Sequence, residues 1–211
     1  MNRPDFSNYL AHFTSNGEPK GGLENNPIAD KSLMSAKERL INILREKKIL
    51  SSLMPWTGVP AVCFTECPWN SLIAHTTRYS PYGIGFDKSF VFSRNGSPAL
   101  YIRPDHYAEQ MSDGKFTKHL WPFITTFAPH YRPQRMKDKY PMPDCDYSHE
   151  REWRVPHDFP FDYNNIKFVI LQNYQDMDEF PKELKDAIGH DKFILMDNYK
   201  KIEELWPVHK F

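Results

Sequence analysis

The segment from Val62 to Phe86, with the sequence VCFTECPWNSLIAHTTRYSPYGIGF, constrains the fold more than any other part of the chain. Its apolar start at 62–64 predicts a short strand. Near its end, Gly83 and Gly85 follow Tyr82 at a spacing that lets a backbone come close to a flat or charged group. An ordinary loop punctuated by proline and glycine, leading into a core strand, would give a similar composition. We expect the rest of the chain to be organised around this segment.

Charge balance limits what the protein can bind. The 211 residues include 27 Lys and Arg and 27 Asp and Glu, so the net charge is zero with neutral histidines. A chain with zero net charge is not attracted as a whole to nucleic acid or to an acidic membrane surface. A local basic groove is still compatible with this charge balance. The length predicts a single domain over 1–211, in which 1–8 and 15–31 are loosely ordered.

The three cysteines, Cys63, Cys67 and Cys145, cannot all pair with one another. Together with an N-terminus that lacks a signal-peptide pattern, this indicates a reducing, cytoplasmic environment. No apolar run approaches the roughly 18 residues that cross a bilayer, so we expect no contact with a membrane. Aromatic residues at 15% and 18 prolines favour a loop-rich fold held by large side chains.

Hydrophobic periodicity predicts more strands than helices. Strands are expected at 9–14, 62–64, 90–92, 98–103, 121–127, 149–156, 166–171 and 193–196. Helices are expected from Ser32, or from the capping box at Ser35, to about 47–48, weakly at 105–121, at 180–188 before Gly189, and as a terminal turn at 202–206. The chain is therefore predicted to be an α+β protein, with one bent, mostly antiparallel sheet and few helices.

One group of polar residues suits chemistry on a nucleoside. His12 and Thr14 would share a strand face, where they can hold a sugar by hydrogen bonds. Tyr82 can stack on a flat ring, and the pair Glu150 and Glu152 can stabilise an oxocarbenium-like transition state. Together they suit cleavage of the nicotinamide–ribose bond of NAD. The alternatives are a structural histidine and an ion-pair ladder on a solvated strand face.

These pieces resemble the mono-ADP-ribosyltransferase superfamily, in particular small bacterial toxins and DarT-like phage-defence proteins. The resemblance is carried, in order, by AHFTS, LINILREKKILSS, YSPYGIGF and EREWRVP. It implies an NAD cleft with His12 at the adenine-side ribose, Tyr82 against nicotinamide, Glu152 as the catalytic carboxylate and Glu150 orienting the acceptor. The other cofactor-binding residues would be Thr14, Tyr79, Gly83 and Gly85.

A second resemblance is more specific in the middle of the chain. The run VCFTECPWNSLIAHTTRYSPYGIGFDKSF with a later REWR is similar to the AbiGi-type abortive-phage-resistance family, over roughly residues 9–156. That family implies a role in phage resistance as the antitoxin member of a pair, and hence a partner protein from the same defence operon.

Two functions follow from these resemblances. The first is a phage-defence enzyme of the ADP-ribosyltransferase type, which would use NAD as a substrate and modify a nucleic-acid or protein acceptor. The alternative is a non-enzymatic antitoxin or sensor that binds a partner protein.

The stretch 129–147 is predicted to be a long loop. Its part at 130–139 interleaves cations with aromatic residues, which suits a single-stranded nucleic acid acceptor. A solvated loop is the commoner origin of such a pattern.

Two kinds of metal site are compatible with the sequence, and we predict neither. Cys63 and Cys67, with Cys145 and His149, have spacings that a zinc ion could use, but free cysteines are common in cores. A magnesium nuclease would use carboxylates with a lysine nearby, drawn from Glu66, Asp87, Glu150, Glu152 and Lys88 or Lys167. Arg154 stands where that lysine is expected, which disfavours a nuclease.

Overall fold

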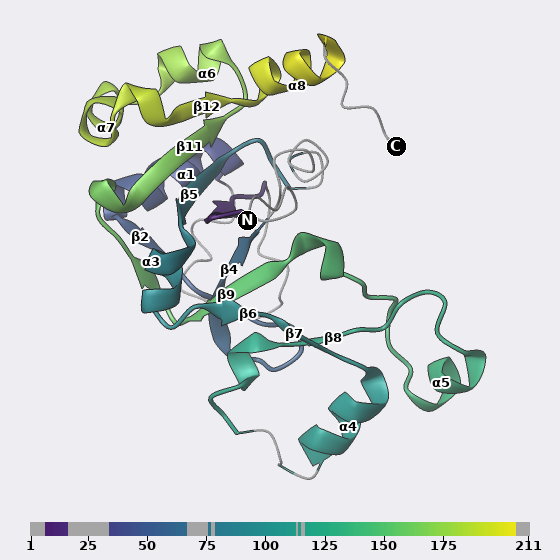
Figure 1. The fold of residues 1–211 in the computed structure, drawn as a ribbon. Helices are drawn as coiled ribbons and strands as arrows, with labels where there is room; N and C mark the ends of the chain where they lie inside the picture. The colour runs from purple at the N-terminus through teal and green to yellow at the C-terminus, as the bar shows by residue number, and fades with distance from the viewer. Residues whose placement is uncertain are drawn as a thin grey trace.

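The computed structural model describes residues 7–16, 34–66, 76, 79–112, 114 and 117–205. Its main sheet has the order β12-β11-β5-β1-β4-β9-β6, with β3 beside β4 (Figure 1). The strands are β1 Tyr9–Phe13, β3 Ser52–Leu53, β4 Pro60–Thr65, β5 Gly83–Asp87, β6 Ser97–Pro98, β9 Glu152–Pro156, β11 Ile166–Leu171 and β12 Phe193–Leu195. Within the described ranges, every neighbouring pair of this sheet is antiparallel except β11 and β12. The predicted α+β class with a mostly antiparallel sheet is confirmed.

Two small strand pairs and several helices surround this sheet. β2 Lys48–Ile49 pairs with β10 Phe159–Pro160, and β7 Leu100–Ile102 pairs in parallel with β8 Ile124–Thr126. The α-helices are α1 Ala36–Glu46, α3 Lys88–Ser93, α4 Pro104–Ser112, α5 Gln134–Lys139, α6 Tyr174–Glu179, α7 Lys182–Ile188 and α8 Met196–Leu205. The 3-10 helices are η2 Trp121–Phe123, η3 Ser148–Glu150, η4 Tyr163–Asn165 and η5 His190–Lys192. In Figure 1, α6, α7 and α8 lie at one end of the molecule and α4 and α5 at the other.

Helix α1 forms where the capping box predicts it. The Ser35 side chain accepts the Glu38 amide, and the Glu38 carboxylate accepts the Ser35 amide, which satisfies donors at the helix start. Leu40 and Leu44 are fully buried on the inner face of α1. They pack in one cluster with Leu10, Val62, Phe64, Ile84, Phe86 and Phe159, which defines the α1 face of the sheet.

The opposite face carries a smaller apolar cluster. Ala11, Phe168 and Ile170 meet Met196 at the start of α8. Here the glycines of β5 are needed by the protein itself. A Cβ at Gly85 would come within 2.2 Å of the Phe168 ring, and one at Gly83 would come within 3.0 Å of Phe13. The flat groups that approach these glycines are therefore side chains of the chain's own core.

Several local predictions differ from the structure. Phe90–Phe92 was expected to be a strand but lies in α3, because a three-residue apolar run carries no period that separates helix from strand. The strand expected from His149 begins at Glu152, after η3. The stretch 129–147 contains α5, and α6 was not predicted. The predicted loose stretches 1–8 and 15–31 fall almost wholly outside the described residues, and the single domain over 1–211 stays a prediction.

Candidate functional site

His12 and Thr14 join β1 to its neighbours. His12 Nδ1 lies 2.9 Å from the Cys63 carbonyl oxygen, and its ring packs edge-on against Phe64. Burial lowers the pKa of His12, and the hydrogen bond to Cys63 only partly offsets this effect. The Thr14 hydroxyl donates to the Ala36 carbonyl oxygen over 2.8 Å. Both side chains thus hold β1 against β4 and α1.

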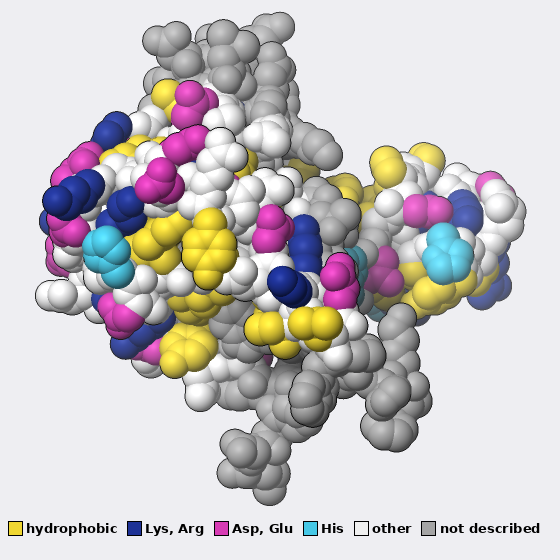
Figure 2. Space-filling model, turned by 90° about the horizontal axis from the view of Figure 1, so that it is seen from above, with side chains coloured by type: hydrophobic (Ala, Val, Ile, Leu, Met, Phe, Trp, Pro, Cys, Tyr) yellow, Lys and Arg dark blue, Asp and Glu magenta, His cyan; other side chains and the backbone are white. Residues whose placement is uncertain are grey.

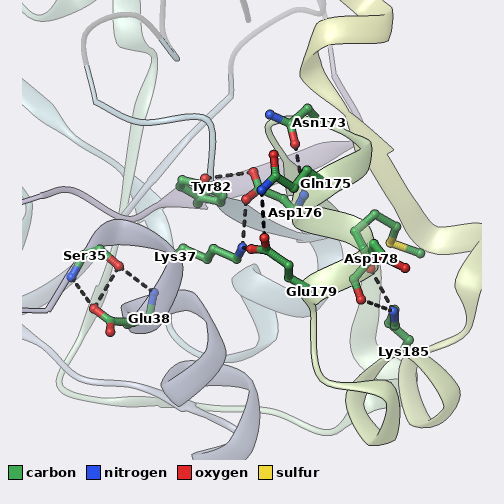
Figure 3. Close-up of polar contacts among 11 residues, drawn as sticks. Ser35, Lys37, Glu38, Tyr82, Asn173, Gln175, Asp176, Asp178, Glu179 and Lys185 are labelled. Carbon is green, nitrogen blue, oxygen red and sulfur yellow. Dashed lines mark hydrogen bonds and ion pairs between the residues drawn. The ribbon is translucent and has the colours of Figure 1, made fainter.

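Tyr82 belongs to a polar network that we call the Asp176 cluster, formed by Tyr82, Lys37, Asp176 and Glu179 (Figure 3). The Tyr82 hydroxyl donates to Asp176 Oδ2 over 2.8 Å. Lys37 Nζ lies 2.8 Å from Asp176 Oδ1 and 2.7 Å from Glu179 Oε2. Burial raises the pKa of Asp176, but hydrogen bonds from Lys37 and Tyr82 outweigh it and leave this pKa below its usual value. The cluster ties α1 and the Tyr82 loop to α6.

Glu152 is held by Arg154 through both carboxylate oxygens. Arg154 Nε lies 2.9 Å from Oε1 and Nη2 lies 2.8 Å from Oε2. The guanidinium also donates to the carbonyl oxygens of Pro122 and Ile124 and to the Thr125 hydroxyl. Arg154 is 3% exposed, so this is a buried and fully hydrogen-bonded cation that fastens the β8 segment to β9. We call Glu152, Arg154 and Thr125 the Arg154 cluster.

Cys63 lies beside the Arg154 cluster, because it stands opposite Arg154 in the pairing of β4 with β9. Burial raises the pKa of its thiol strongly, and the negative charge of Glu152 raises it further. A thiol with a raised pKa is a poor nucleophile and a poor metal ligand.

Glu150 and Tyr79 are brought together. The Tyr79 hydroxyl donates to Glu150 Oε1 over 2.8 Å, and the Glu150 side chain is buried. Thr65 donates its hydroxyl to the Glu150 carbonyl oxygen. Between the two glutamates, Arg151 has φ 47°, a left-handed conformation that directs Glu150 away from the line of β9.

The predicted NAD residues do not share one side of the sheet. Ala11 lies opposite Thr65, and Thr65 lies opposite Glu152, so these three side chains point to one face. His12 follows Ala11 and therefore points to the other face, in agreement with its contact to Phe64. Tyr82 also packs on the α1 face. His12 and Tyr82 thus lie on the α1 face and Glu152 on the opposite face, and the role of each in NAD binding stays a prediction.

The metal hypotheses find little support in the described residues. No group of three or more His, Cys, Asp or Glu among them could hold a metal ion. Cys67 lies outside the described residues, so the zinc site is untested. Two carboxylates considered for a nuclease do lie beside the lysines considered with them, Glu66 at 2.9 Å from Lys88 and Asp87 at 2.8 Å from Lys167, so these pairs do not count against that hypothesis.

Residues 129–147 form what we call the projecting lobe, which contains α5 and extends away from the sheet (Figure 1). Its base is a bridge in which Ala128 and Cys145 exchange two backbone hydrogen bonds of 2.8 Å. The Arg132 side chain, 5% exposed, donates to the Ala128 and Met142 carbonyl oxygens and to Asp144. The predicted loop is therefore an ordered element with a buried cation inside it.

Sequence reasoning missed the residues that organise these contacts, which are Lys37, Arg132, Arg154 and Asp176. A weak signal existed for one of them. Asn173 stands three residues before Asp176 and caps α6 by accepting the Asp176 amide, a pattern that a search for helix starts can find. Arg132 and Arg154 each bond two backbone carbonyl oxygens from other parts of the chain, and residue types do not reveal such partners.

The geometry first defines a class: a mixed α/β protein with an open, mostly antiparallel sheet and buried ion pairs at its polar positions. The particular family comes from the sequence. The family described as "Putative abortive phage resistance protein AbiGi, antitoxin" matches residues 34–186, which is more than half of the chain, so the chain belongs to the AbiGi family. No curated protein and no solved structure is significantly similar to it. The AbiGi resemblance is confirmed, whereas likeness to ADP-ribosyltransferases is not shown.

Among the described helices, none has the length and apolar character needed to cross a bilayer.

Proposed function

We propose that this protein is the non-enzymatic antitoxin of an abortive-infection system and acts by binding a partner protein of that system. The family description, which names an antitoxin, supports this function. The observation that carries the proposal is the ion pair between Glu152 and Arg154. Both of its carboxylate oxygens are engaged by Arg154, which is itself buried and bound to β8.

A carboxylate that stabilises a ribosyl cation must reach the substrate with an oxygen atom. To free Glu152, Arg154 would have to lose its charge partner while it stays buried, at a cost of about 3–5 kcal/mol. The other proposed catalytic groups are engaged as well, Tyr82 with Asp176 and Glu150 with Tyr79. These contacts suit a scaffold that presents a fixed surface better than a site that closes on NAD.

The proposal is tested by co-expressing the chain with the protein encoded next to it in the same defence operon. We expect the chain to restore growth of cells that make that neighbour and to copurify with it at a fixed ratio. Glu150→Gln and Glu152→Gln should do the same, after circular dichroism confirms that they fold.

Purified protein incubated with labelled NAD separates this function from the enzymatic one. We expect no release of nicotinamide and no labelled product with protein or nucleic-acid acceptors. Turnover of NAD by the wild type that Glu152→Gln abolishes would establish the transferase instead. Glu150→Gln provides a second variant, because its amide oxygen can still accept the Tyr79 hydroxyl and preserve the fold.

A further inference from the structure

Within the projecting lobe, which the structure describes in full, only Pro129, Arg132 and Cys145 are buried. None of the six residues of α5, all of them described, is buried. Tyr131 is 67% exposed. Figure 2 shows apolar, cationic and histidine side chains together on the surface of this projecting part, at the right of the view. Fixing a residue's backbone costs about 1–2 kcal/mol, and α5 offsets little of this cost by burial, because Met136 is its one apolar side chain and is only partly buried.

The order of the lobe comes from its own internal contacts. The Ala128–Cys145 bridge closes its base. Arg132 connects this base to two positions inside the lobe, with Nη1 at 2.7 Å from the Ala128 carbonyl oxygen and 3.0 Å from Asp144 Oδ1, and with Nη2 bonded to the Met142 carbonyl oxygen. A surface element that is already ordered by a buried arginine loses less conformational entropy when it binds a partner. The internal order of the lobe therefore favours a role in binding.

The exposed residues of the lobe indicate the kind of partner. Arg135, Lys137 and Lys139 lie on α5, and Lys139 Nζ lies 5.2 Å from the centre of the Tyr140 ring. Tyrosine and arginine are enriched at the centres of protein interfaces. The lobe also holds the carboxylates Asp138, Asp144 and Asp146, which oppose a polyphosphate backbone. This mixture of basic, acidic and aromatic side chains favours a protein over a nucleic acid as the binding partner.

We propose that the projecting lobe is the element by which this protein docks on its partner, and that it contacts an acidic surface of the partner with a recess for Tyr131. This inference rests on the proposed antitoxin function and deepens it. Arg135 and Lys139 are four residues apart on α5 and share one exposed face, where they meet complementary carboxylates. Lys137 adds to the positive charge that speeds the encounter, while Tyr131 supplies the apolar anchor.

The test measures the dissociation constant of the full chain with the purified protein encoded beside it, by calorimetry. Tyr131→Ala, and separately the triple variant Arg135→Glu, Lys137→Glu and Lys139→Glu, should each weaken binding at least about tenfold. A matched triple variant with the same charge change on other exposed positions, Arg94→Glu, Lys182→Glu and Lys201→Glu, should stay within about twofold. The loss caused by the α5 triple variant should shrink at high salt.

Each other outcome overturns a distinct statement. If wild-type protein binds its neighbour and the lobe variants bind equally well, the docking inference is wrong and the antitoxin function stands. If the wild type binds no operon neighbour, the antitoxin function itself fails. If the α5 triple variant loses affinity for a single-stranded RNA oligonucleotide but keeps its affinity for the neighbour protein, the lobe is a nucleic-acid site.

Discussion

The sheet body and the projecting lobe reach order by different means. In the body, Phe159 is fully buried and its ring lies 5.0 Å from that of Phe64 and 5.1 Å from that of Phe86, edge to face. In the lobe, the central side chain is the charged Arg132, and its partners are mainly backbone carbonyl oxygens. A cluster of apolar rings stabilises everything that packs on it, whereas a set of directed hydrogen bonds stabilises one loop. The comparison predicts that damage to the body is global and damage to the lobe is local.

The largest effect is expected from Phe159→Ala. Removing this ring leaves a cavity against Phe64, Phe86 and Phe90, and the free energy of unfolding should fall by about 3–5 kcal/mol. Urea denaturation followed by circular dichroism measures the loss. A change below about 1 kcal/mol would mean that the aromatic cluster is not the main source of stability in the body.

Arg154→Met tests how β8, which precedes the lobe in the chain, is attached to β9. It should cost about 3 kcal/mol, because the Glu152 carboxylate is left without its partner next to the sheet. The double variant Glu152→Gln with Arg154→Met removes both charges and should recover most of that loss in the same denaturation experiment. If the double variant is no more stable than the single one, the uncompensated charge is not the cause.

Arg132→Met should act on the lobe alone, with a local cost of about 1–2 kcal/mol from lost hydrogen bonds to Ala128, Met142 and Asp144. Hydrogen exchange should speed up at 129–147 and stay unchanged in β4 and β5. Faster exchange in the sheet would show that the lobe and the body unfold together, and the distinction between them would be lost.

Asp176→Asn should have the smallest effect, about 1 kcal/mol at neutral pH. The pKa of Asp176 in the folded protein is below its usual value, so its stabilising contribution is complete above the unfolded-state pKa and is lost as the pH falls through the folded-state pKa. Wild-type stability should therefore fall more steeply below about pH 4 than that of Asp176→Asn. Parallel slopes would contradict this assignment.

The sequence predicts elements well where a local pattern decides the outcome. The capping box at Ser35 fixes the start of α1, the apolar run 166–171 gives β11, and Gly189 ends α7. Phe90–Phe92 shows the limit of such local patterns, because its apolar residues fit a strand and a helix equally well. The structure places them in α3, where Phe90 packs against Phe86 and Phe159.

Prediction of the candidate site depended on which face each strand shows, and that is set by pairing between distant segments. His12 and Glu152 each lie on a strand predicted from the sequence, and the alternation of Glu152 and Arg154 against Trp153 and Val155 agrees with the structure. Nothing in either segment specifies that Ala11, rather than His12, shares a face with Thr65 and Glu152. A shift of one residue in register exchanges the faces, so local patterns could not decide whether these residues meet.

Strands that pair in the sheet lie far apart along the sequence, and this separation affects how a newly made chain folds. β4 ends at Thr65 but its neighbour β9 begins at Glu152, and β5 ends at Asp87 but its neighbour β11 begins at Ile166. Folding slows as contacting residues lie farther apart along the chain. The sheet therefore stays incomplete on the ribosome until both late strands have emerged, whereas the bridge from Ala128 to Cys145 can already close. The contacts that order the lobe lie within 128–145 and need neither late strand.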